Sequence, residues 1–148
     1  MLPVVRNVKN WWLSVIGRRG SALLFFGLLD CFYSWSLLAL PPEAKQTPSY
    51  IFVEKIAPVE VWAGVWGVVG LICFVSAFLP SRKDFIAFTA AIAVFSLWGL
   101  VYMAGDIAGA IYRGTVSAII WFAFALFVFL ISGWPEVRGG DEWTQESS

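Results

Sequence analysis

The stretch SALLFFGLLDCFYSWSLLAL, residues Ser21–Leu40, decides the fold of this chain. It follows two arginines, Arg18 and Arg19, and ends at Pro41-Pro42. About 20 apolar residues at a helical rise of about 1.5 Å per residue cross a hydrocarbon core of about 30 Å. The stretch therefore predicts a membrane-spanning helix, and the rest of the chain is interpreted relative to a bilayer.

The composition of the whole chain agrees with this interpretation. Of its 148 residues, 59% are hydrophobic and 14% are charged, whereas about 25% charged residues is usual in soluble domains. Three further apolar segments are long enough to cross a membrane, at residues 59–79, 84–104 and 115–133. We predict an all-α membrane protein in which residues 21–134 form a bundle of four transmembrane helices.

The segments outside the four spans are expected to lie at the membrane surface. Residues 1–20 alternate apolar and basic side chains at helical spacing, which predicts a short interfacial helix with Trp11 and Trp12 at headgroup depth. The polar residues 135–148 predict a cytoplasmic tail. The connection Pro41–Pro58 contains four prolines, so we expect no long regular structure there, although Tyr50–Val53 is expected to pack back against the bilayer or the bundle.

The distribution of positive charge predicts the orientation. If the N-terminus is cytoplasmic, seven basic residues lie on the inner side and three on the outer side. By the positive-inside rule, we expect both termini in the cytoplasm and the chain in the inner membrane. The ten basic and ten acidic residues of the whole chain balance, which argues against a nucleic-acid partner.

Asp30 is the outstanding candidate for a functional residue, because it lies near the centre of the first span. A carboxylate at that depth costs about 2.5–3.5 kcal/mol on insertion scales, so it is expected to face protein or water. A protonated carboxyl bonded to Ser96, or to Asp30 of a second copy, would satisfy it, and Ser34 extends the polar strip one turn further. The strip serves either as a proton or ion site, or the lining of a water-filled lesion, or as a structural contact that fixes helix packing.

Small side chains line one face of the second span and favour close helix packing in lipid. They recur at steps of three and four residues: Ala63, Gly67, Gly70, Cys73 and Ala77. In the first span, Gly27 adds a small residue one helical turn from Asp30. Trp62 and Trp134 lie near span ends, where tryptophan is enriched at the membrane interface. We expect the small face to join helices or copies, and the tryptophans to anchor the protein.

Catalysis is not expected. The chain has no histidine, which removes the usual general base and the commonest metal ligand. It also lacks nucleotide-binding glycine motifs, a nucleophile elbow and paired-cysteine metal motifs. We predict no enzyme activity, no catalytic residue, no metal and no cofactor.

The overall layout resembles the small four-span membrane proteins encoded by tailed phages and prophages of actinobacteria, many of which are called holin-like. The similar stretches cover most of the chain: Arg18-Arg19-Gly20, Gly27-Leu28-Leu29-Asp30, Ala57-Pro58, Val61-Trp62-Ala63-Gly64, Leu97-Trp98-Gly99-Leu100 and Gly114–Trp121. The resemblance implies a protein that self-associates in the inner membrane and permeabilises it.

Two other hypotheses remain open. The chain could instead be a non-catalytic accessory or interaction subunit of a larger membrane complex, or a phage exclusion factor. It could also be a small proton-coupled channel or transporter that uses Asp30. In every case the lipid bilayer is a partner, together with further copies of the chain or other subunits.

Overall fold

The computed structural model describes residues 16–79 and 84–135. Within these ranges the chain is helical and has no strand: α2 Gly17–Leu38, α3 Pro42–Lys45, α4 Pro48–Ile56, α5 Val59–Ser76, α6 Phe85–Ile107 and α7 Gly114–Ser132. Helices α2, α5, α6 and α7 are long and apolar enough to cross a membrane. The protein is therefore an all-α, multi-pass membrane protein.

The four long helices lie close to the predicted spans. Helix α2 begins at Gly17, before the predicted start at Ser21, so that Arg18 and Arg19 belong to the helix. Helix α5 ends at Ser76, whereas α6 continues to Ile107. The interfacial helix predicted around Trp11 and Trp12 lies outside the described residues. Residues 136–148 of the predicted tail also lie outside them.

The connection between α2 and α5 is more regular than the sequence predicted. Its prolines begin helices instead of preventing them, because Pro42 and Pro48 each stand at the start of a helix. Proline suits the first helical position, where its missing N–H would have no partner within the helix. Val53 of α4 is buried, at 2% exposure, so this segment packs against the bundle as expected.

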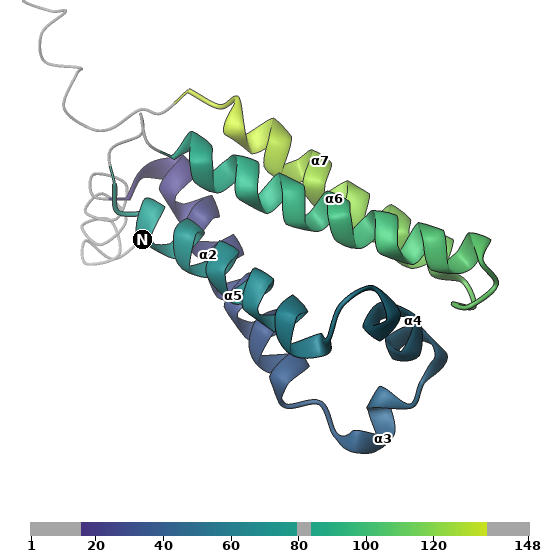
Figure 1. Ribbon diagram of the computed structural model, residues 1–148. Coiled ribbons are helices and arrows are strands. Elements are labelled where there is room, and N and C mark those ends of the chain that lie inside the picture. Colours follow the sequence, from purple (N-terminus) through teal and green to yellow (C-terminus); the bar gives the residue numbers. More distant parts are fainter. Residues whose placement is uncertain (1–15, 80–83, 136–148) are drawn as a thin grey trace, which may run out of the picture.

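The four long helices form two closely packed pairs, α2 with α5 and α6 with α7, which meet mainly between α5 and α6 (Figure 1). Glycines allow the first pair to approach closely. A Cβ atom on Gly70 would stand 2.9 Å from the Cys31 nitrogen, and one on Gly27 would stand 2.9 Å from the Gly70 oxygen. Because no side chain separates the backbones there, dispersion contacts join the two helices over their length.

Aromatic rings fill the space between the two pairs. Phe26 of α2 packs against Phe95 of α6 and Phe127 of α7, with ring centroids 5.9 and 6.3 Å apart. Trp66 of α5 lies 5.6 Å from Phe95 and 5.4 Å from Trp121. Large rings thus separate the pairs, while small residues join the helices within the α2–α5 pair.

The bundle is closed by different contacts at its two ends. At the end where α2 begins, Arg19 forms a salt bridge of 3.0 Å with Asp84, and its guanidinium lies over the Phe88 ring. At the opposite end, α4 contacts α5 and α6 (Figure 1). There the indole nitrogen of Trp62 donates to the Val53 carbonyl at 3.4 Å.

Candidate functional site

Asp30 lies in the interior of the bundle, with 0% of its surface exposed. Helix α2 directs it there because residues three and four positions away share its side of the helix. Two of those residues, Phe26 and Tyr33, contact rings of the α6–α7 pair. The other two, Gly27 and Ser34, face α5. Asp30 therefore stands between two levels of aromatic rings, at the junction of the helix pairs.

The upper of these levels, toward α4, is organised around Tyr33. Its ring lies 4.5 Å from Trp66, 5.4 Å from Trp121 and 6.0 Å from Trp98. The Trp98 indole N–H donates to the Tyr33 hydroxyl at 2.9 Å. This hydrogen bond ties α2 to α6 and satisfies two polar groups that would otherwise be buried without partners.

The Asp30 carboxyl itself has no such partner. Neither of its oxygens makes a hydrogen bond within the described part of the chain, and the same is true of the Trp66 indole nitrogen. The expected bond between Asp30 and Ser96 is therefore not formed. A buried carboxyl without partners costs free energy, about 1–3 kcal/mol for a neutral polar group and more for a charged one. The site thus contains an uncompensated polar group in an aromatic interior.

The predicted polar strip of α2 meets α5 at its two ends. Ser34 donates to the Ala63 carbonyl at 2.7 Å and faces α5, as does Gly27. Asp30 stands three residues from Gly27 and four from Ser34, so it shares their side of the helix, and Phe26 and Tyr33 flank it on its other side. Asp30 therefore lies between the residues that face α5 and the rings that contact the α6–α7 pair.

The small face of α5 is occupied within the chain. Gly67 faces Ser34, Gly70 faces Cys31, and Ala77 meets Gly20, all on α2. Cys73 points elsewhere, since its thiol lies 3.6 Å from the Ala87 carbonyl of α6. An association of copies through this face would have to separate α2 from α5 first, so any contact between closed copies must use other surfaces.

The tryptophans predicted as interface anchors have different surroundings. Trp134, after the end of α7, is 48% exposed, whereas Trp62 is 6% exposed and packs on Trp98 at 5.0 Å. The structure does not place Trp62 at an exposed interface position, because Val53 of α4 and Trp98 of α6 cover it. Trp62 belongs to the aromatic interior.

Two contacts of the structure were not anticipated from the sequence. One is the cluster of Tyr33, Trp66 and Trp98 above Asp30, whose spacing along their own helices gives no sign that they meet. The other is the pairing of Arg19 with Asp84, which joins the two helix pairs. The sequence offered one sign of this pairing: Arg19 and Asp84 both lie within about one helical turn of the same predicted membrane surface.

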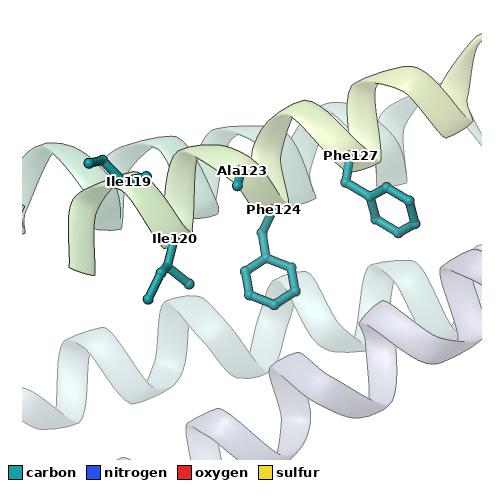
Figure 2. Close-up of a pocket in the computed structure, with 5 residues that line it drawn as sticks. All are labelled: Ile119, Ile120, Ala123, Phe124 and Phe127. Carbon is teal, nitrogen blue, oxygen red and sulfur yellow. The ribbon is translucent and has the colours of Figure 1, made fainter. Parts of the chain in front are cut away.

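A groove lies on α7 beside the aromatic interior. It has a volume of about 320 Å³, and its lining is wholly apolar: Ile119, Ile120, Ala123, Phe124 and Phe127. In Figure 2 the side chains of Ile120, Phe124 and Phe127 point from α7 toward the other helix pair. Phe127 packs on Phe26, and Phe124 packs on Phe95 at 5.9 Å. The groove is thus separated from the level of Asp30 by rings.

The chemistry available at this site is that of one carboxyl group, which can bind a ligand or transfer a proton. Within residues 16–79 and 84–135, no three His, Cys, Asp or Glu side chains come together as metal ligands. Comparison with protein-family models, with curated proteins and with solved structures gave no match.

Proposed function

We propose that this chain is a holin-like, non-catalytic protein of the inner membrane, which self-associates and permeabilises the bilayer when its two helix pairs separate. In this proposal both termini are cytoplasmic, as the distribution of basic residues favours. The protein's partners are lipid and further copies of itself.

The observation that carries the proposal is the buried, unpartnered carboxyl of Asp30 at the junction of the helix pairs. Burial of this group destabilises the closed bundle, because water would hydrogen-bond the carboxyl and the described residues do not. Separation of the pairs would hydrate it and remove that cost. The Asp30 carboxyl therefore favours opening, because opening exposes it to water.

The packing supports separation at this junction and not within the pairs. The α2–α5 pair is joined by direct backbone contact at Gly27 and Gly70, whereas the α2–α5 and α6–α7 pairs contact each other much less extensively. Separated pairs would expose aromatic rings and Asp30 together. Copies that open side by side could cover the rings against one another and turn the carboxyls toward water, which links opening to self-association.

The experiment is inducible expression in a bacterium loaded with a membrane-potential dye. The wild-type protein is expected to depolarise the membrane abruptly after a delay. Asp30→Leu should lengthen that delay or abolish depolarisation, because leucine at this site carries no cost of buried polarity. Glu60→Gln is the matched control, since it also removes a carboxylate but at an exposed position paired with Lys45.

Three results would contradict the proposal. The first is equal timing in the wild type and Asp30→Leu at equal membrane levels. The second is the absence of depolarisation at high levels of wild-type protein. The third is purification in a stoichiometric complex with an unrelated protein and no depolarisation, which would favour an accessory subunit.

A further inference from the structure

The groove on α7 opens on the outside of the bundle. Three of its lining residues, Ile119, Ile120 and Phe127, are 60, 52 and 50% exposed. They lie in the middle of a helix that is long and apolar enough to cross a membrane. We propose that this groove binds the acyl chain of an anionic phospholipid whose phosphate contacts Arg113. The inference concerns the closed bundle, and its test does not depend on permeabilisation of the membrane.

Arg113 supplies positive charge at one end of α7. It immediately precedes the helix and is exposed, and its guanidinium forms no salt bridge within the described part of the chain. The Asp106 carboxylate instead accepts the Gly114 N–H at 3.1 Å and the Thr115 hydroxyl. Because Asp106 already caps the start of α7, Arg113 is the group that remains to contact a phosphate, and a guanidinium binds phosphate through two parallel hydrogen bonds.

A line of apolar side chains on α7 leads from Arg113 into the groove. Val116, three residues after Arg113, is 45% exposed. At steps of four, three and four residues it is followed by lining residues of the groove: Ile120, Ala123 and Phe127. Residues at this spacing lie one above another on one face of a helix. An acyl chain that begins beside Arg113 therefore meets only apolar side chains along this line.

The length of a lipid tail matches the distance from Arg113 to the groove. Ala123 is ten residues after Arg113, which is about 15 Å along the helix at about 1.5 Å per residue. One leaflet of a bilayer with a hydrocarbon core of about 30 Å is also about 15 Å thick. A tail whose phosphate is at Arg113 therefore ends in the middle of the groove.

A second copy of the chain is the competing occupant of the groove. Two copies that lie in the membrane with the same orientation and pack through this face would place their Arg113 residues at the same depth, beside each other. These like charges repel, whereas a lipid phosphate attracts the same guanidinium. The charge at the end of the line therefore favours an anionic lipid over a second copy.

The test is photolabelling of the full-length protein in phosphatidylcholine vesicles. The probes are phosphatidylglycerol and phosphatidylcholine with the same diazirine-bearing acyl chain, and labelled residues are mapped by mass spectrometry. The anionic probe should label residues 116–127 about fivefold more, equivalent to about 1 kcal/mol for one basic residue near an anionic lipid. Arg113→Gln should bring this ratio close to one. Arg18→Gln, which removes an exposed arginine at the opposite end of the bundle, should leave it unchanged.

A further variant tests the groove without altering charge. Ala123 lines the groove and is exposed, so Ala123→Phe should lower labelling of this segment by the anionic probe while circular dichroism stays unchanged. Equal labelling of the wild type by the two probes, an unchanged ratio in Arg113→Gln, or undiminished labelling in Ala123→Phe would overturn the proposal. Cross-linking between copies through Ala123→Cys, with Cys31 and Cys73 replaced by serine, would also overturn it, because a second copy would then occupy the groove.

Discussion

Substitution of Gly70 by alanine should weaken the pairing of α2 with α5. A Cβ atom there would lie 2.8 Å from the Cys31 sulfur, 2.9 Å from the Cys31 nitrogen and 3.0 Å from the Gly27 oxygen. Ordinary contacts between non-bonded heavy atoms are about 3.5–4.0 Å. Two of the three obstructing atoms are backbone, so rotation of a side chain cannot remove the overlap and the helices must move apart.

The expected magnitude follows from two opposing effects. Overpacking of this kind typically costs about 1–3 kcal/mol, while alanine is favoured over glycine within a helix by about 0.5–1 kcal/mol. Gly70→Ala should therefore lower the free energy of unfolding by about 1 kcal/mol, and by at most about 2.5 kcal/mol. Gly64→Ala is the matched control on the same helix, because nothing lies within 4 Å of a Cβ there, and it should be neutral or stabilising.

Unfolding in mixed micelles, with increasing denaturing detergent and tryptophan fluorescence as the signal, would measure both variants. Trp66, one turn before Gly70 on α5, is fully buried and should report separation of the helices. A Gly70→Ala variant as stable as the wild type, or a Gly64→Ala variant that loses as much stability as Gly70→Ala, would contradict steric overlap between α2 and α5 at this position.

Two further substitutions test the contacts at the ends of the helices. Arg19→Ala should lower the free energy of unfolding by about 3 kcal/mol, because it removes the salt bridge to the buried Asp84 carboxylate. Arg18→Ala at an exposed position should have little effect in the same detergent titration, and similar losses in both variants would argue against a specific salt bridge. Asp106→Ala should increase amide hydrogen exchange in the first turn of α7, because the Asp106 carboxylate accepts the Gly114 N–H at 3.1 Å, and unchanged exchange at Gly114 would contradict this capping role.

The positions of the spans could be predicted because they depend on local properties. A run of about 20 apolar residues is visible in the sequence whatever the helices contact. The close packing of α5 could also be anticipated in part, since small residues at Gly67 and Gly70 favour close approach in lipid. Their partner could not be identified, because a small face fits α2 of the same chain and a second copy equally well.

The arrangement around Asp30 depended on information that one helix does not contain. Asp30 and Ser34 are one turn apart on α2, yet Ser34 bonds to the Ala63 carbonyl, whereas the Asp30 oxygens have no hydrogen bond within the described residues. Only the positions of α5 and α6 decide which of these polar side chains finds a partner. The burial of Trp62 could not be predicted for the same reason. Helix α4 covers it, and the four prolines of that connection had predicted an irregular segment.

The proposed function requires that the two helix pairs separate when the membrane is permeabilised. Cys73 of α5 reports on this separation directly, because its thiol is fully buried and lies against the Ala87 carbonyl of α6. In a Cys31→Ser background, Cys73 is the single remaining thiol, and Asp30 is left intact. Its modification by a charged, water-soluble thiol reagent should be measured in cells before and after depolarisation, with detergent-denatured protein as the full-labelling control. Cys73 should be protected before depolarisation and modified after it; depolarisation with Cys73 still protected would contradict separation of the pairs.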